Sequence, residues 1–191
     1  MAKERLGSPR ARLFVALELP EDVVEGVAAL ARDVFGPVDE LRLVRPESLH
    51  VTLVFLGYQP EREVERIAEI AFDQPAGPFD LVADAVVPVP QRRPRLYALG
   101  LEDAGGALHG WQDRLSRRLE EARLYEPEKR PFWPHVTLAR VKRGVRVPGG
   151  LPLPELPAEL RRPFRASRVT LFRSTLKPSG AVYEPLAGIE G

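Results

Sequence analysis

Hydrophobic and polar positions alternate along seven short stretches of the chain, and this pattern predicts β-strands. The predicted strands are Leu13–Leu19, Leu49–Leu56, Phe79–Val87, Leu96–Leu101, His135–Val141, Arg168–Phe172 and Ala181–Leu186. In three other stretches apolar residues recur every three or four positions, which predicts amphipathic helices. These helices are expected over Glu21–Phe35, Pro60–Phe72 and Ala107–Ala122. Strands and helices are therefore mixed along the whole chain.

The predicted elements occur twice in the same order. His135 follows His50 by 85 positions, and the pair Pro163-Phe164 follows Pro78-Phe79 by the same 85 positions, each pair opening a strand. Two copies are too few for a solenoid, so the offset favours a duplicated unit. The whole chain, residues 1–191, is then expected to form a single domain of two lobes.

The approximate repeats span residues 12–94 and 95–180, and a C-terminal strand at 181–186 is expected to complete one of the sheets. The second repeat differs from the first between its motif strand and its Pro-Phe strand. There the segment Val145–Leu160 is rich in Pro and Gly, where the first repeat has a helix. This composition predicts a surface loop or a short helix.

The same four residues, HVTL, occur once in each repeat, at positions 50–53 and 135–138. Side chains alternate along a strand, so His50 and Thr52 share one face, as do His135 and Thr137, while Val and Leu face the core. A single copy is explained by the solvent-exposed face of an antiparallel strand. Two copies at one offset instead favour a site, because two packed lobes would bring the pairs together across a groove.

Two opposed imidazoles can serve as a general base and a general acid, because their ordinary pKa of about 6.5 allows both protonation states near neutral pH. In-line displacement at phosphorus needs such a pair. A threonine hydroxyl can donate to a non-bridging phosphoryl oxygen as charge develops there. No metal is required for this chemistry. A metal site with a third, carboxylate ligand is the alternative that the residue types leave open.

Composition narrows the classes of protein. The chain has a net charge of +1 and no cysteine, which excludes disulfides and thiolate chemistry. It contains no apolar run approaching the roughly 18 residues of a membrane span and no signal-peptide pattern, so a cytoplasmic protein without membrane contact is expected. Between Lys129 and Lys177 there are 12 basic residues against two acidic ones. This excess is typical either of a solvated face or of a site for a phosphate-bearing ligand.

The segments "LHVTLVFLG" and "RPFWPHVTLAR" resemble the two His-x-Thr-x motifs of the 2H phosphoesterase superfamily. More narrowly, with the opening "RLFVALELP", the chain resembles the bacterial and archaeal RNA 2′,3′-cyclic phosphodiesterases, historically called 2′-5′ RNA ligases. The resemblance covers nearly the whole chain. It implies a bilobal, pseudo-twofold α+β fold, with antiparallel sheets lining a central cleft and helices packed outside.

The resemblance also implies roles for the motif residues. His50 matches the proton donor to the leaving oxygen, His135 matches the proton acceptor that activates water, and Thr52 and Thr137 match the phosphate-binding threonines. The implied reaction opens a terminal RNA 2′,3′-cyclic phosphate to a 2′-phosphomonoester, and a related reaction in reverse joins RNA ends through a 2′-5′ bond. We expect no cofactor, no metal and no obligatory protein partner, and hence a monomer.

Three further residues flank the second motif as candidates for substrate binding. Arg130 precedes the strand, and Phe132 could stack on a base. Arg140 lies five positions after His135, so strict alternation places it on the opposite face unless a bulge intervenes. Two other functions remain open: the same chemistry on a small cyclic-phosphate nucleotide or a 2′-5′ oligonucleotide, and a nucleotide- or RNA-binding module without turnover.

Overall fold

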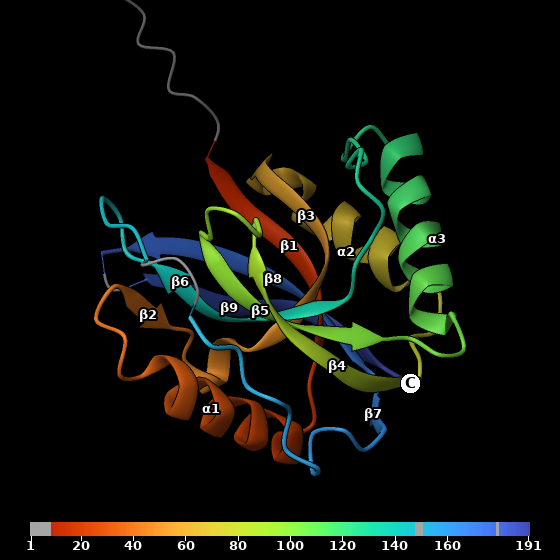
Figure 1. Ribbon diagram of the computed structural model, residues 1–191. Helices are drawn as coiled ribbons and strands as arrows, with labels where there is room; N and C mark the ends of the chain where they lie inside the picture. Colours follow the sequence, from red (N-terminus) through yellow and green to blue (C-terminus); the bar gives the residue numbers. More distant parts are fainter. Residues whose placement is uncertain (1–8, 148–150, 179) are drawn as a thin grey trace, which may run out of the picture.

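The computed structural model describes residues 9–147, 151–178 and 180–191, and Figure 1 shows how its strands and helices are arranged. The strands are β1 (Arg10–Glu18), β2 (Leu41–Leu43), β3 (His50–Pro60), β4 (Phe79–Val89), β5 (Leu96–Glu102), β6 (His135–Val141), β7 (Phe164–Ala166), β8 (Arg168–Lys177) and β9 (Gly180–Glu190). The helices are α1 (Glu21–Phe35), α2 (Val64–Phe72) and α3 (Ala107–Glu121), with 3₁₀ turns at Pro46–Ser48 and Glu61–Glu63.

Every predicted strand and helix is present. Helix α1 and strand β6 begin and end at the predicted residues, whereas β8 and β9 extend several residues beyond their predictions. The predicted helix over Pro60–Phe72 is α2 with a 3₁₀ turn before it. Strand β2 was not predicted, because three residues are too few to show an alternation.

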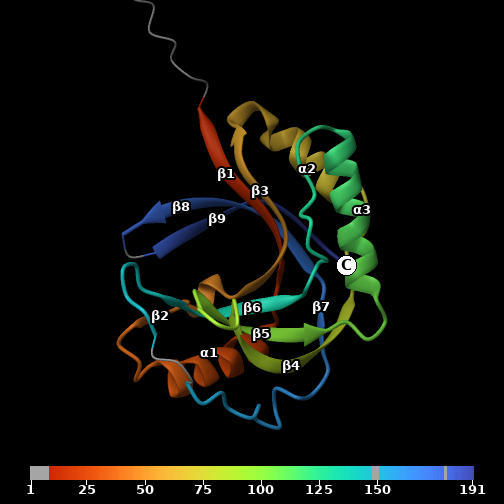
Figure 2. The same cartoon turned by 45° about the horizontal axis from the view of Figure 1, so that its top comes forward.

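The strands form one curled antiparallel sheet, which Figure 2 shows from a second direction. In the described parts of the chain its order is β7-β4-β5-β6-β3-β1-β8-β9, with β2 paired to β6. The predicted α+β class is therefore confirmed, and the two motif strands, β3 and β6, are neighbours at the centre of the sheet.

The two sequence repeats do not form separate halves of this sheet. Strand β4 comes from the first repeat but pairs with β5 of the second, and β8 from the second repeat pairs with β1 of the first. The β4–β5 pairing follows from a short connection, since consecutive antiparallel strands joined by a few residues form a hairpin. Strand β9 pairs with β8 and lies at the edge of the sheet.

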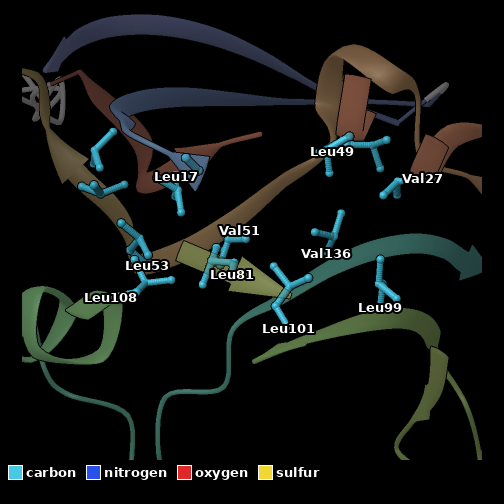
Figure 3. Packing of buried hydrophobic residues seen from close by; sticks show 14 of the residues in the cluster. Leu17, Val27, Leu49, Val51, Leu53, Leu81, Leu99, Leu101, Leu108 and Val136 are labelled. Atoms are coloured by element: carbon cyan, nitrogen blue, oxygen red, sulfur yellow. The ribbon is translucent and has the colours of Figure 1, made fainter. Parts of the chain in front are cut away.

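One core cluster extends through the molecule on the helix side of the sheet. Figure 3 shows Val51 of β3 and Val136 of β6 packed among buried leucines from other strands. Helix α3 presents its apolar stripe to this core through Leu108, Trp111, Leu115 and Leu119, all at most 1% exposed. None of the helices in the described residues is long and apolar enough to cross a membrane.

The described part of the Pro- and Gly-rich segment, up to residue 147 and from 151 on, contains no helix or strand before Phe164. The predicted loop is thus observed there, while residues 148–150 lie outside the described residues. Leu156 and Leu160 anchor the loop on the core. A Cβ atom on Gly26 of α1 would lie 3.0 Å from Leu160, so glycine permits the loop to pack closely on this helix.

Candidate active site

The two HVTL segments meet on neighbouring strands. Val51 pairs with Val136 in antiparallel register, and continuing this register places Thr137 beside His50 and Thr52 beside His135. Because the valines face the core, the polar side chains share the opposite face. One pocket of about 110 Å³ is lined by the polar side chains of both motifs, His50, Thr52, His135 and Thr137.

Both imidazoles are oriented by the same backbone contact. The Nδ1–H of His50 donates to the carbonyl oxygen of Ser48 at 2.8 Å, and the Nδ1–H of His135 donates to that of Trp133, also at 2.8 Å. In the neutral ring this leaves Nε2 as the basic nitrogen. The Thr52 hydroxyl donates to Nε2 of His50 at 3.1 Å. Each histidine is therefore preset to exchange a proton through Nε2.

Burial keeps both imidazoles neutral. It lowers the pKa of His50 from 6.5 to about 4, against a hydrogen bond to Ser48 that raises it, and the positive charge of Arg140 lowers it further. Burial also lowers the pKa of His135, with the same opposing backbone bond and the same added effect of Arg140. At neutral pH the free protein therefore presents two unprotonated histidines to the pocket.

Arg140 lines the same pocket as the histidines, so strict alternation does not hold along β6. The pairing of β6 with β5 skips Leu138, and both Leu138 and Ala139 are buried. This β-bulge returns the next side chain to the face of His135. The bulge thus adds a guanidinium to a site that otherwise holds imidazoles and hydroxyls.

Strand β3 contains the same irregularity. Its pairing with β1 skips Leu53, and Leu53 and Val54 are both buried. Phe55, five residues after His50, therefore occupies the position that Arg140 has in β6, and it also lines the pocket. The two motif strands thus have a bulge at the same place, but β3 presents an aromatic ring there, whereas β6 presents a guanidinium.

The sequence marked none of six further residues that line the pocket: Arg12, Phe14, Val44, Ser48, Phe55 and Tyr183. The guanidinium of Arg12 lies 4.5 Å from the centre of the Phe55 ring. Alternation along β1 could have identified Arg12 and Phe14, since Leu13, Val15 and Leu17 occupy the core face. No comparable signal marked Tyr183, because the pairing of β9 with β8 brings it to the site.

The other two candidates, Arg130 and Phe132, lie outside this pocket. They line an adjoining groove of about 430 Å³ that also borders Thr52 and His135. The Phe132 ring packs edge-on against His109, with ring centres 5.2 Å apart. Instead, the neighbouring Trp133 stacks on His135 at 4.4 Å between centres.

The pocket is positively charged. Its lining contains Arg12 and Arg140 but neither Asp nor Glu. Across the described residues, no group of three or more His, Cys, Asp or Glu side chains is arranged to hold a metal ion. A pocket with guanidinium, imidazole and hydroxyl donors suits an anion such as a phosphate.

Comparison with known proteins identifies relatives of the whole chain. The model of the family described as LigT like phosphoesterase matches residues 17–96 and 99–183. The RNA 2′,3′-cyclic phosphodiesterase of Archaeoglobus fulgidus is 30% identical over 189 residues, covering 94% of this chain and 99% of the relative. The enzyme of the same name from Thermus thermophilus is 33% identical over 190 residues, covering 92% and 87%.

Solved structures have the same fold. A crystal structure of a Thermus thermophilus protein has a TM-score of 0.77 at 29% identity and covers 94% of this chain and 97% of its own. Escherichia coli LigT in its apo form also has a TM-score of 0.77, at 24% identity, covering 96% and 98%. The family match confirms the resemblance carried by the two His-x-Thr motifs: the chain belongs to the LigT-like phosphoesterase family.

Proposed function

We propose that this phosphoesterase hydrolyses the 2′,3′-cyclic phosphate at the end of an RNA strand to a 2′-phosphomonoester. The observation that carries the proposal is the single pocket lined by His50, Thr52, His135 and Thr137 from two adjacent strands. The names of the relatives from Archaeoglobus and Thermus support the same substrate. The pocket's positive charge suits an anionic phosphodiester.

In the proposed reaction, Nε2 of His135 takes a proton from a water molecule. The water oxygen then forms a bond to phosphorus while the bond from phosphorus to O3′ breaks in line with it. Protonated His50 donates its Nε2 proton to the departing O3′, which leaves a 3′-hydroxyl and a 2′-phosphate. The step ends with His135 protonated and His50 neutral, and proton exchange with solvent restores the starting state.

In this proposal, binding of the anionic substrate protonates His50 and so makes it the general acid. In the free protein the pKa of His50 is lowered to about 4 by burial, so its imidazole carries no proton at neutral pH. A cyclic phosphate anion beside Nε2 favours the charged imidazolium and raises this pKa. Thr52 and Thr137 then donate to the non-bridging oxygens, and Arg140 balances the charge that develops on them.

Ligation would use the same atoms. If the 5′-hydroxyl of a second RNA strand takes the place of water, the attack on phosphorus forms a 2′-5′ phosphodiester. His135 would accept the proton of that hydroxyl, and His50 would again protonate O3′. We propose this reaction as a secondary activity of the same pocket.

The test is turnover of a short RNA ending in a 2′,3′-cyclic phosphate, with EDTA present. His50→Ala and His135→Ala are each expected to lower kcat by about 10² to 10⁴-fold, the typical range for loss of a general acid or base. His109→Ala is the matched control, because this exposed histidine of α3 bonds to Asp103 outside the pocket. Thermal unfolding of each variant verifies that it is folded.

Product analysis completes the test. A 2′-phosphate supports the proposed leaving oxygen, whereas a 3′-phosphate would show that O2′ leaves instead. Activity close to wild type in either pocket variant would remove that histidine from the mechanism. Loss of activity in EDTA, restored by a divalent metal, would contradict the two-histidine mechanism in favour of a metal-dependent one.

A further inference from the structure

A second positively charged pocket adjoins the pocket that contains His50 and His135. It has a volume of about 280 Å³ and shares Arg12 and Arg140 with the first pocket. Its own lining adds Arg42 and Arg45, and contains neither Asp nor Glu. Four guanidinium groups thus surround a space that the proposed hydrolysis of one phosphate does not use.

Two of these arginines are forced together by the sheet. Arg42 of β2 lies directly opposite Arg140 of β6 in antiparallel register, and Figure 1 shows the two strands side by side. Residues opposite each other across a strand pair project to the same face, and like charges at such positions destabilise the pair. Among the described residues neither arginine forms a salt bridge. An anion between them would relieve the repulsion.

The titration of Arg140 is consistent with this geometry. Partial burial lowers the pKa of its guanidinium, and the positive charges of Arg42 and Arg12 lower it further, while Tyr183 acts in the opposite direction. By contrast Arg45 is paired with Glu47 at 3.3 Å, so its charge is partly balanced. Among the described residues Arg12 has no acidic partner either, so the uncompensated charge lies at Arg42, Arg140 and Arg12.

The side chain of Arg42 is exposed, and a glycine packs beside it. Gly180, at the start of β9, also lines the second pocket, and a Cβ atom there would be 3.7 Å from Cζ of Arg42. Any longer side chain would extend over the guanidinium and compete with a ligand. The φ angle of Gly180 is +126°, a conformation that also favours glycine.

We propose that Arg42, together with Arg140 and Arg12, forms a subsite for a second phosphate group of the same substrate molecule. Arg140 then contacts both phosphates, since it lines both pockets. This inference rests on the proposed function and adds to it a requirement for a second phosphate in the substrate. The preferred substrate carries a phosphate beyond the cyclic one, as a dinucleotide or longer strand does and a nucleoside cyclic phosphate does not.

The experiment compares kcat/KM for three substrates: a nucleoside 2′,3′-cyclic phosphate, the same compound with a 5′-phosphate, and a dinucleotide with a cyclic-phosphate end. Arg42→Gln is expected to lower kcat/KM for the dinucleotide by about tenfold, the effect of one lost charge-assisted hydrogen bond, and to change that for the nucleoside by less than about twofold. The substrate with a 5′-phosphate shows whether a terminal phosphate is enough to occupy the subsite or whether an internal phosphodiester is needed.

Arg32→Gln is the matched control, because it removes the same charge from an exposed position on α1 that lines neither pocket. It should leave kcat/KM for all three substrates unchanged. Equal losses on the nucleoside and the dinucleotide in Arg42→Gln would overturn the subsite, as would no loss on any substrate.

A binding measurement separates this inference from the proposed function. Wild type and Arg42→Gln are titrated calorimetrically with a nucleoside 2′-phosphate and with a dinucleotide ending in a 2′-phosphate. Tighter binding of the dinucleotide by wild type alone supports the subsite even if no substrate is hydrolysed, in which case only the hydrolytic proposal fails. Equal affinity of wild type for the two ligands would overturn the subsite.

Discussion

The imidazole of His50 lies among aromatic rings. The ring centres of Phe14, Tyr183 and Phe172 lie 5.0, 5.3 and 6.5 Å from that of His50. These rings exclude water from an ionisable group, which is why its pKa falls to about 4. The residue that the proposed mechanism uses as an acid is therefore neutral until an anion reaches the pocket.

This environment predicts how stability depends on pH. Above pH 6.5 His50 is neutral in both folded and unfolded chains and has no effect. As the pH falls from 6.5 towards 4, only the unfolded chain gains the proton, so the free energy of unfolding decreases. At about 1.4 kcal/mol per pKa unit, the loss reaches about 3 kcal/mol near pH 4.

Urea unfolding of wild type and His50→Gln at pH 7 and pH 4.5 measures this effect. The variant should lose less stability than wild type between the two pH values, because glutamine has no proton to gain. His135, whose pKa is also lowered, is present in both proteins, so the difference reports His50 alone. The same loss in both proteins would contradict the lowered pKa.

At the scale of the secondary-structure elements, the pairing of β5 with β6 positions the second histidine. Gly100 of β5 lies opposite His135, and a Cβ atom on Gly100 would lie 3.3 Å from the Trp133 indole. That indole stacks on His135 with the two rings inclined by 15°. A small residue on β5 therefore makes room for the ring that packs against the proposed base.

Gly100→Ala is predicted to lower kcat several-fold by displacing Trp133 and hence His135. We expect KM to change little, because Gly100 lines neither the pocket that contains His50 and His135 nor the second pocket that contains Arg42. Gly105→Ala is the control, since a Cβ atom there meets no other atom within 4 Å. Steady-state kinetics together with thermal unfolding of both variants provide the measurement. A Gly100→Ala enzyme with wild-type kcat would show that the position of Trp133 does not affect the base.

On the scale of the whole molecule, the strand order ties the two sequence repeats together. Because β4 pairs with β5 and β8 with β1, neither repeat forms a sheet of its own. The buried residues likewise form one cluster that draws on both repeats. We therefore expect a single cooperative unfolding transition.

The two tryptophans, Trp111 and Trp133, both belong to the second repeat and report its unfolding by fluorescence. Leu17→Ala removes a fully buried side chain of β1 in the first repeat, and is predicted to lower the free energy of unfolding by about 3 kcal/mol. Fluorescence and circular dichroism should report the same shifted midpoint. Leu176→Ala, at a position 63% exposed, is the control and should change stability by less than about 0.5 kcal/mol. An unshifted fluorescence midpoint in Leu17→Ala would mean that the repeats unfold independently.

The local pattern of apolar and polar residues predicted most of the helices and strands. The apolar period of α1 and the alternation in β6 predicted both elements to the residue, because each has a strongly amphipathic sequence. The same alternation placed His50 and Thr52 on one face. Strand β2 escaped prediction because it has three residues and exists through its pairing with β6.

The sequence by itself determined the family, the class of elements and the two polar pairs, since these depend on residue type and on periodicity over a few positions. The tertiary structure alone decided which strands pair, and therefore that Arg140 returns to the site through a bulge, that Tyr183 reaches it from β9, and that Arg42 lies opposite Arg140. Register and bulges depend on contacts between residues far apart in the chain, which no local pattern contains.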